Sequence, residues 1–385
     1  MISTFGIKNY RNLNNLQLKS LGRINLITGK NNTGKSALLE AISIYTTKAD
    51  ISWIVSLLQE RGEYYRNSNN SDPVEMNLKT FSSLFCGRKI SFFDVYSAIQ
   101  IGQLEDNLFG SEISSTSMTI RIIKFFEEII KQPNLENEER IITRRKKTII
   151  DEKEDKSYTD SQIGIEIKGK DFYSILPLDS DRPYRLLNYH QNKISENIQY
   201  IRTRNIESEL NGRLWDNIAL STKEEFLIRA LKIIEPNIER LTFINNTTTA
   251  RQERIPVIKL KNEPNIIPLK SMGDGINRIL TIILALINSD NGYLLIDEVE
   301  NGLHYTVQEK LWNIIFDLAK ELNVQIFATT HSLDCIKSFE KVLNSQNDFN
   351  DCKLIRLDII NNLIKQVEYD ANELKVASNQ EIEIR

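Results

Sequence analysis

One motif constrains the fold of this 385-residue chain more than any other feature. It spans residues 29–36, reads Gly-Lys-Asn-Asn-Thr-Gly-Lys-Ser and matches G-x-x-x-x-G-K-[ST] without a gap. A β-rich run, Arg23–Thr28, precedes it, and apolar residues at helical spacing begin near Lys35. A glycine-rich loop between a strand and a helix is the context of a phosphate-binding loop. The motif therefore predicts an α/β domain in which this loop binds nucleotide phosphates.

The residue types in this loop fit the chemistry of phosphate binding. Glycines allow backbone N–H groups to converge on phosphate oxygens, and the N-terminus of the following helix adds positive potential. We expect Lys35 to reach the β and γ phosphates and Ser36 to ligate Mg²⁺. A glycine turn with an incidental lysine is the alternative, and the flanking strand and helix argue against it. The predicted nucleotide-binding residues of the loop are Gly29, Asn31, Asn32, Thr33, Gly34, Lys35 and Ser36.

A pair of acids complements the loop. Asp297 and Glu298 follow the apolar run Tyr293–Ile296, which reads as a buried strand. A phosphate loop needs a second acid to hold the metal, and we expect Asp297 to be that Mg²⁺ ligand. Glu298 is placed to orient or deprotonate the attacking water, so we predict that it is catalytic together with Lys35. The alternative is that the two acids cap the helix that follows.

Two further segments are candidates for contacts with the γ-phosphate. Residues 271–275 read Ser-Met-Gly-Asp-Gly and open an apolar helix, so their backbone donors predict an anion-binding nest. Because the Lys35 loop already serves the phosphates of its own chain, this nest predicts ATP held between two chains. An ordinary glycine helix start is the alternative. His331 follows a second predicted core strand, Val324–Thr329, at the end where parallel strands place ligand contacts. We expect it to be catalytic and to donate to the γ-phosphate.

Composition argues against several other classes of protein. The hydrophobic fraction of 41% and the charged fraction of 26% are those of a globular chain. The longest apolar run, residues 279–287, is far shorter than the roughly 20 residues of a membrane helix, so we expect no membrane partner. A net charge of −3 provides no general attraction to polyanions. Three scattered histidines predict no histidine-based metal site. The three distant cysteines favour a reducing cytoplasm; they are Cys86, Cys335 and Cys352.

The chain divides into an α/β head and a long intervening segment. Residues 1–48 and 266–385 carry the motifs, and strands and helices alternate there in the pattern of a parallel sheet. For residues 49–265 we expect an insertion that completes a lobe of the head and is largely helical, with some antiparallel strands. Within it, Ile51–Glu60 and Thr119–Lys131 have helical periodicity, and Ser161–Leu176 reads as two antiparallel strands.

The motifs described above, and the order in which they occur along the chain, resemble those of ABC-type ATPase heads. The chain is similar to the branch that holds the SMC proteins, RecF and the OLD-like AAA family ATPases of prokaryotic defence systems. It resembles the OLD-like group most, because its signature serine, Ser271, is followed by Met-Gly-Asp-Gly. The resemblance implies an ABC-type P-loop ATPase head with a mixed sheet and flanking helices. It is carried by residues 7–13, 29–36, 271–278, 297–304 and 329–332.

The resemblance also implies roles for individual residues. Arg11 would lie near the nucleotide, and Ser271, Gly273 and Gly275 would contact ATP bound to the opposite chain of a homodimer or higher oligomer. Asn32 stands where SMC-like loops usually carry glycine. Long heptad arms are absent from the sequence, so we exclude the SMC proteins themselves. Residues 332–385 are too few for the C-terminal Toprim nuclease that many OLD-like proteins carry.

We therefore expect an enzyme that binds ATP with Mg²⁺, hydrolyses ATP and dimerises around it. The resemblance implies that it regulates a separate effector, a nuclease, in anti-phage defence. DNA is a candidate partner through the cluster that ends in Lys146 and Lys147, although a solvated hairpin is the favoured interpretation of that cluster. A RecF-like DNA repair ATPase is the main alternative. A transporter's nucleotide-binding subunit is a third, and the Ser-Met-Gly-Asp-Gly signature argues against it.

Overall fold

The computed structural model describes most of the chain and divides it into two compact units. The residues described are 1–65, 72–107, 110–134, 137–153, 160–179, 197–203, 208–246, 253–261, 263–345 and 351–379. The first unit comprises residues 1–4, 18–46 and 195–385. The second comprises residues 5–17 and 47–194. Residues 195–265, which the sequence pattern groups with the insertion, therefore cluster with the head motifs in the first unit.

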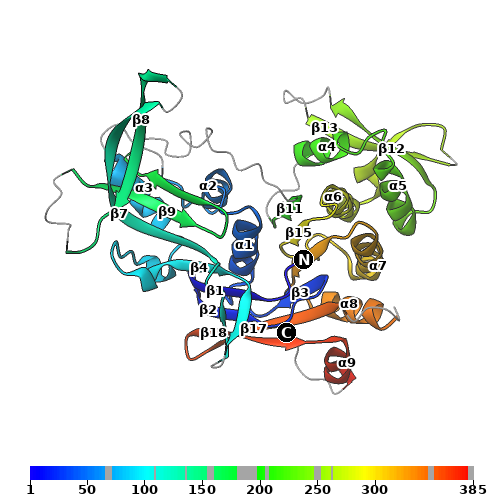
Figure 1. Ribbon diagram of the computed structural model, residues 1–385. Helices are drawn as coiled ribbons and strands as arrows, with labels where there is room; N and C mark the ends of the chain where they lie inside the picture. Colours follow the sequence, from blue (N-terminus) through cyan, green and yellow to red (C-terminus); the bar gives the residue numbers. More distant parts are fainter. Residues whose placement is uncertain are drawn as a thin grey trace. The chain divides into compact units, whose positions relative to one another are not determined.

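The first unit is built on a six-stranded sheet with the order β11-β15-β16-β3-β17-β18 (Figure 1). β11, β15, β16, β3 and β17 run parallel, and β18 returns antiparallel to β17. β3 and β16 are buried along their whole length, which explains their mostly apolar sequences. The strands are β3 (Ile24–Thr28), β11 (Ile198–Ile201), β15 (Tyr293–Ile296), β16 (Gln325–Thr329), β17 (Cys352–Ile360) and β18 (Leu363–Tyr369).

Helices cover both faces of this sheet. α1 lies on one side, and α6 and α7 lie on the other (Figure 1). The core around α7 and α8 includes Trp312, Phe316 and Phe339, whose rings meet edge to face. The helices are α1 (Lys35–Thr46), α4 (Ser208–Asp216), α5 (Lys223–Ile234), α6 (Asp274–Asn288), α7 (Tyr305–Glu321), α8 (Leu333–Ser345) and α9 (Ala371–Asn379). A small sheet precedes α6 and consists of β12 (Ile238–Asn246), β13 (Glu253–Leu260) and β14 (Ile267–Pro268), followed by the short 3₁₀ helix Leu269–Met272.

The second unit is dominated by a seven-stranded sheet with the order β10-β9-β7-β4-β1-β2, in which β8 also pairs with β7. The contacts of β4 with β1, and of β7 with β4, β8 and β9, are antiparallel. Its strands are β1 (Phe5–Tyr10), β2 (Leu13–Leu18), β4 (Ile99–Gly102), β7 (Met118–Asn134), β8 (Asn137–Ile149), β9 (Gln162–Lys168) and β10 (Tyr173–Pro177). The same unit contains the hairpin β5 (Leu104–Asn107) and β6 (Gly110–Ile113) and the helices α2 (Ile51–Glu60) and α3 (Pro73–Ser82).

The helix predicted over Thr119–Lys131 is wrong, because this segment is the middle of β7. Its apolar residues recur at a spacing that suits a helix, but most of them are β-branched or aromatic, and they pair across to β8 and β9. The pattern also predicts helices across Glu196–Ile244, where β11 and β12 flank α4 and α5. The expectation that residues 49–265 are largely helical is therefore corrected, since strands predominate there.

The alternation predicted near the end of the chain is confirmed. The predicted strands Tyr293–Ile296 and Val324–Thr329 correspond to β15 and β16, the second beginning one residue later than predicted. Ile51–Glu60 is α2, and Ser161–Leu176 contains most of the β9–β10 hairpin. The fold class is thus the predicted α/β head with a mixed sheet and flanking helices. Among the described residues, no helix is both long enough and apolar enough to cross a membrane.

Candidate nucleotide-binding site

Loops that carry the predicted site residues meet at one edge of the six-stranded sheet. They follow β3, β15 and β16, which are neighbours in the order β15-β16-β3. The register pairs Ile296 with Ala328 and Ala328 with Leu26, so the three carboxyl ends lie at the same level. Ligand sites of open parallel sheets form outside this edge. The sheet therefore brings together the phosphate loop, the acid pair and His331.

The backbone of the phosphate loop limits which residues it accepts. Gly29 has a φ of 142°, and a Cβ atom there would lie 2.4 Å from the carbonyl oxygen of Leu357. Glycine is therefore required at this position. Gly34 has a φ of 90° immediately before α1. Asn32 has a φ of 66°, a left-handed conformation that asparagine tolerates better than most residues, which explains how it replaces glycine.

Bonds within the loop position its lysine. Nζ of Lys35 donates to the carbonyl oxygens of Gly29 and Lys30 at 2.6 and 2.9 Å. Thr33 is buried and donates its Oγ1 to the same carbonyl of Lys30 at 2.8 Å. Asn31 is exposed at the tip of the loop. The ammonium group is therefore held against the loop backbone, within the segment where phosphate oxygens would bind.

Ser36 and Asp297 are in contact although 261 positions separate them in the sequence. Oγ of Ser36 donates to Oδ2 of Asp297 at 2.9 Å. Oδ1 of Asp297 accepts from Oγ1 of the buried Thr329 at 2.6 Å. A hydroxyl and a carboxylate are oxygen ligands that Mg²⁺ uses together with substrate phosphates, so the donor set fits this ion. Within the described ranges, no group of three or more His, Cys, Asp or Glu side chains could hold a metal by itself.

Glu298 follows Asp297 in a left-handed conformation with a φ of 50°. Its backbone N–H donates to Oγ1 of Thr329 at 2.8 Å. Its Oε1 lies 3.7 Å from Nδ1 of His331, and the same Nδ1 lies 3.3 Å from Oε1 of Glu300. The backbone N–H of His331 also donates to this Glu300 oxygen at 3.0 Å. The predicted base and the predicted γ-phosphate donor are therefore neighbours, and the buried Glu300 orients the histidine.

Arg278 is a buried cation beside this turn, and the sequence motifs assign it no role. It is only 1% exposed. Its Nη2 donates to the carbonyl oxygens of Asp297 and Glu298 at 3.0 and 3.1 Å, and its Nη1 donates to the carbonyl of Arg202 at 3.4 Å. Burial lowers the pKa of this guanidinium, and the carboxylates of Asp297, Glu300 and Glu298 oppose that shift. The signal in the sequence is one arginine within the apolar helix that follows the Ser-Met-Gly-Asp-Gly segment.

The segment Ser271–Gly275 lies at the start of α6. Ser271 and Gly273 are exposed, and Oγ of Ser271 donates to the carbonyl oxygen of Pro268 at 2.7 Å. Gly273 precedes the first residue of α6 with a φ of 108°, and a Cβ atom there would meet nothing within 4 Å. Gly275 is partly buried. The segment therefore exposes a helix N-terminus, which favours an anion, although the backbone N–H of Gly273 itself donates to the carbonyl oxygen of Lys270 at 3.0 Å.

Arg11 belongs to the second unit, in the turn between β1 and β2. Its backbone N–H donates to the carbonyl oxygen of Leu84 at 2.8 Å. Its Nη1 pairs with Oε2 of Glu63 at 2.7 Å, and its side chain is only 8% exposed. Its guanidinium also lies over the ring of Tyr10. The position of Arg11 near the nucleotide stays a prediction from the resemblance.

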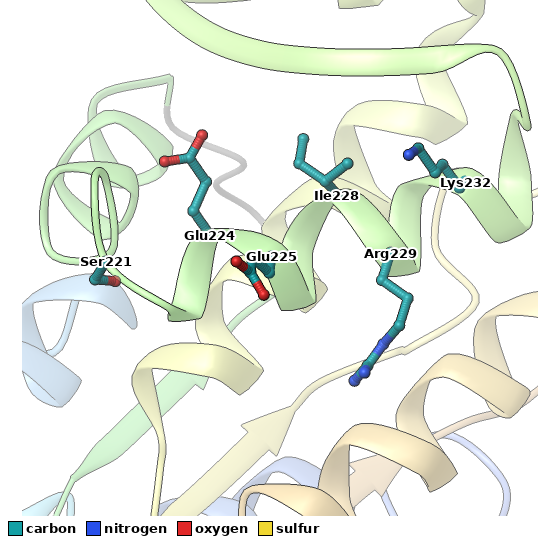
Figure 2. A pocket seen from close by; sticks show the side chains of 6 residues that line it. All are labelled: Ser221, Glu224, Glu225, Ile228, Arg229 and Lys232. Atoms are coloured by element: carbon teal, nitrogen blue, oxygen red, sulfur yellow. The ribbon is translucent and has the colours of Figure 1, made fainter.

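A surface hollow lies elsewhere in the first unit, along α5 (Figure 2). Its lining comes from one face of this helix and from Ser221, two residues before the helix begins, with charges of both signs. Arg229 forms an ion pair with Glu321 on α7. The hollow contains none of the predicted site residues, so it is separate from the candidate site. The lining residues are Ser221, Glu224, Glu225, Ile228, Arg229 and Lys232.

Comparisons with known proteins give a family match, a relative in sequence and similar solved structures. The family described as AAA ATPase domain matches residues 1–336. A protein named ATP/GTP phosphatase from Helicobacter pylori (strain ATCC 700392 / 26695) is 26% identical over 367 residues, which cover 93% of this chain and 92% of that protein. Among solved structures, the SMC head bound to the C-terminal winged-helix domain of ScpA has 12% identity and a TM-score of 0.47, and covers 96% of this chain and 97% of its own. The SMC head domain from Thermotoga maritima has 10% identity and a TM-score of 0.43, and covers 96% of this chain and 99% of its own.

Proposed function

The chain belongs to the AAA ATPase domain family, and from this membership we propose that it dimerises around ATP and regulates a separate effector protein. The family is named for its ATPase activity, and the Helicobacter pylori relative is named as a phosphatase of ATP and GTP. The chain is therefore an ATPase, which converts ATP and water to ADP and phosphate. Its use of ATP to form a dimer and to control an effector is the proposal.

One contact carries the assignment of the site: Oγ of Ser36 donates to Oδ2 of Asp297 at 2.9 Å. It joins the phosphate loop to the end of β15, where the metal ligands of a P-loop site belong. We propose that Ser36 and Asp297 hold Mg²⁺, which when bound neutralises negative charge on the phosphate oxygens. Lys35 binds the β and γ phosphates, and the loop N–H groups surround them.

Glu298 is the proposed general base. Its carboxylate takes a proton from water as the water oxygen bonds to the γ-phosphorus and the bond from phosphorus to ADP breaks. His331 donates a hydrogen bond to the γ-phosphate. Glu300 supports that role, because it accepts from the backbone N–H of His331 at 3.0 Å and lies 3.3 Å from Nδ1, so that Nε2 is the ring nitrogen available to phosphate.

The proposed dimer places Ser271, Gly273 and Gly275 against the γ-phosphate of ATP bound to the other chain. The exposure of Ser271 and Gly273 supports this, since an anion can reach the helix N-terminus from solvent. Glu298→Gln should give a dimer with ATP and Mg²⁺ and a monomer without nucleotide, as measured by size-exclusion chromatography with light scattering. Lys35→Ala should stay monomeric in both conditions. A Glu298→Gln chain that remains a monomer at saturating ATP would contradict the proposal.

The effector is proposed to be a nuclease that acts in the cytoplasm against phage. This part rests on the Ser-Met-Gly-Asp-Gly signature and its resemblance to OLD-like proteins. Cells that carry this gene with its neighbouring genes should resist phage, and Lys35→Ala should abolish resistance in a plaque assay. A neighbouring nuclease gene whose product is also required would support the proposal. Neighbouring repair genes, with sensitivity to DNA damage in place of phage resistance, would favour the RecF-like alternative.

DNA is a separate candidate partner, and the β7–β8 hairpin is where the sequence places its contact. The register of the β7–β8 hairpin places Glu128 opposite Lys146 and Glu127 opposite Lys147. Acids opposite lysines reduce the positive charge that this hairpin offers to phosphates. We therefore expect Lys146→Glu to have little effect on duplex binding in a fluorescence anisotropy titration. Loss of binding in this variant would assign the hairpin to DNA.

A further inference from the structure

Arg278 connects α6 to the turn that carries the proposed base. The side chain enters this turn from the second turn of the helix and is 1% exposed. One nitrogen, Nη2, donates to the carbonyl oxygens of both Asp297 and Glu298, at 3.0 and 3.1 Å. A buried guanidinium that serves backbone carbonyls fixes the position of the peptide groups, because each lost bond would leave a buried polar atom unpaired.

The residue held in this way has a backbone conformation that needs support. Glu298 has a φ of 50°, which costs a non-glycine residue about 1 kcal/mol or more. Its carbonyl oxygen accepts from Arg278, and its N–H donates to Oγ1 of Thr329 at 2.8 Å. Both peptide groups of Glu298 are therefore fixed, one from α6 and one from the end of β16. The direction in which its carboxylate leaves the backbone depends on these two bonds.

The other end of the connection is the start of α6. Arg278 lies one helical turn after Asp274, the first residue of α6. The same helix start lies close to the loop after β15, since a Cβ atom added to Gly275 would be 3.2 Å from the carbonyl oxygen of Gly302. A displacement of the helix start would therefore reach the Glu298 turn through the guanidinium of Arg278.

We propose that Arg278 is a positioning residue that holds Glu298 in its hydrolytic orientation and couples it to phosphate binding at the start of α6. The inference rests on the proposed function, because it takes Glu298 as the general base. Arg278 donates to backbone carbonyl oxygens, so it acts through the backbone of the turn that carries Asp297 and Glu298. Its removal should slow the chemical step and leave ATP affinity nearly unchanged, because Lys35 and the loop N–H groups are not involved.

A double-mutant cycle tests this role. Arg278→Lys keeps a positive charge, but its side chain is one atom shorter, and its single nitrogen cannot replace Nη1 and Nη2 together. In the wild-type background it should reduce the single-turnover rate at saturating ATP by about tenfold to 100-fold, with less than about a threefold change in ATP Kd. In the Glu298→Gln background it should reduce the residual rate by less than about twofold, since the group that it positions is already absent.

Thr281→Val is the matched control for packing of α6. It removes a buried hydroxyl that donates to the carbonyl oxygen of Asn277 at 2.9 Å within the helix, so it should reduce the rate by less than about twofold. Equal loss from Arg278→Lys in both backgrounds, or a loss of ATP affinity that accounts for the lower rate, would overturn the inference. If Arg278→Lys does not fold by circular dichroism, Arg278→Gln, which retains N–H donors, is put through the same cycle.

The outcomes also separate this inference from the proposed function. If Glu298→Gln hydrolyses ATP at the wild-type rate, the proposed base is wrong, and the inference falls with it. If Glu298→Gln is slow but Arg278→Lys keeps the wild-type rate, the base stands and the role of Arg278 is overturned.

Discussion

The phosphate loop and the start of α6 both expose N–H groups at a helix N-terminus, yet they are built very differently. The two ends of the loop pack against their own unit, while its tip is exposed: Thr33 is buried, and a Cβ atom on Gly29 would collide with the carbonyl of Leu357. At the start of α6, Ser271 and Gly273 are exposed, and a Cβ atom on Gly273 would meet nothing within 4 Å. The conformation of the phosphate loop is fixed by residues packed against it, whereas the start of α6 is open to solvent.

This difference indicates that the two regions have different roles in binding the nucleotide. A site that must hold a charged phosphate by itself needs fixed donors, a lysine and metal ligands. Lys35 and Ser36 of the loop, together with Asp297 after β15, are the proposed set. An exposed nest has few groups that would hold a nucleotide alone, and it suits a second contact to a phosphate that is already bound. Changes in the loop should therefore act on nucleotide binding, and changes at α6 should act on assembly and rate.

The largest expected effect is that of Lys35→Ala. It should abolish ATP hydrolysis and lower nucleotide affinity below detection in a filter-binding assay, because the γ-phosphate loses its charged partner. Lys337→Ala, on the exposed side of α8, is the matched control and should bind ATP normally. If Lys35→Ala hydrolyses ATP at the wild-type rate, the loop is not part of the active site, and the proposed difference between the loop and the start of α6 is wrong.

Glu298→Gln should give the next largest effect. Hydrolysis should slow by about 100-fold or more, because an amide cannot accept the proton of the attacking water. ATP affinity should stay close to that of the wild type, since Asp297 and Ser36 are retained; equilibrium binding of a fluorescent ATP analogue measures this. If affinity falls as far as in Lys35→Ala, Glu298 belongs to the binding part of the site and is not the base.

Thr329→Val should give an intermediate effect. The hydroxyl is fully buried, donates to Oδ1 of Asp297 at 2.6 Å and accepts from the backbone N–H of Glu298 at 2.8 Å. Its loss should lower the free energy of unfolding by about 1–3 kcal/mol and slow hydrolysis by about tenfold. Urea denaturation and phosphate release measure the two effects. Thr46→Val, which removes only the bonds of its hydroxyl to the carbonyl oxygens of Ile42 and Ser43 within α1, should keep normal turnover. An equal slowing in both variants would contradict the role given to Thr329.

The smallest signal is expected from mixing two inactive chains. Lys35→Ala and Ser271→Arg should each be inactive alone, because Lys35→Ala does not bind ATP and every shared site of Ser271→Arg is defective. In a mixed dimer one of the two sites is intact and can hold ATP between the chains, so at most about half of wild-type activity should return in an equal mixture. Phosphate release on mixing measures this. If the mixture stays inactive while a cross-linking assay detects mixed dimers, Ser271 does not act on the opposite chain.

The sequence alone identifies the parts of the site that are contiguous in the chain. The phosphate loop is recognisable because its glycines, Lys35 and Ser36 lie within eight positions and are flanked by a strand and a helix. Asp297 and Glu298 are recognisable because they directly follow an apolar strand. The strand and helix order near the end of the chain also follows from sequence, since the period of apolar residues is a local property.

The tertiary structure decides what depends on residues that are far apart in sequence. Thr119–Lys131 has a period compatible with a helix, and only its pairing with β8 and β9 makes it a strand. The contact of Ser36 with Asp297, and the hold of Arg278 on the Glu298 turn, likewise have no local signal. Hydrogen bonds and strand pairing join whichever groups the fold brings within about 3 Å. The sequence specifies which hydrogen-bond donors and acceptors are present. The packing of the sheet and helices decides which of them come into contact.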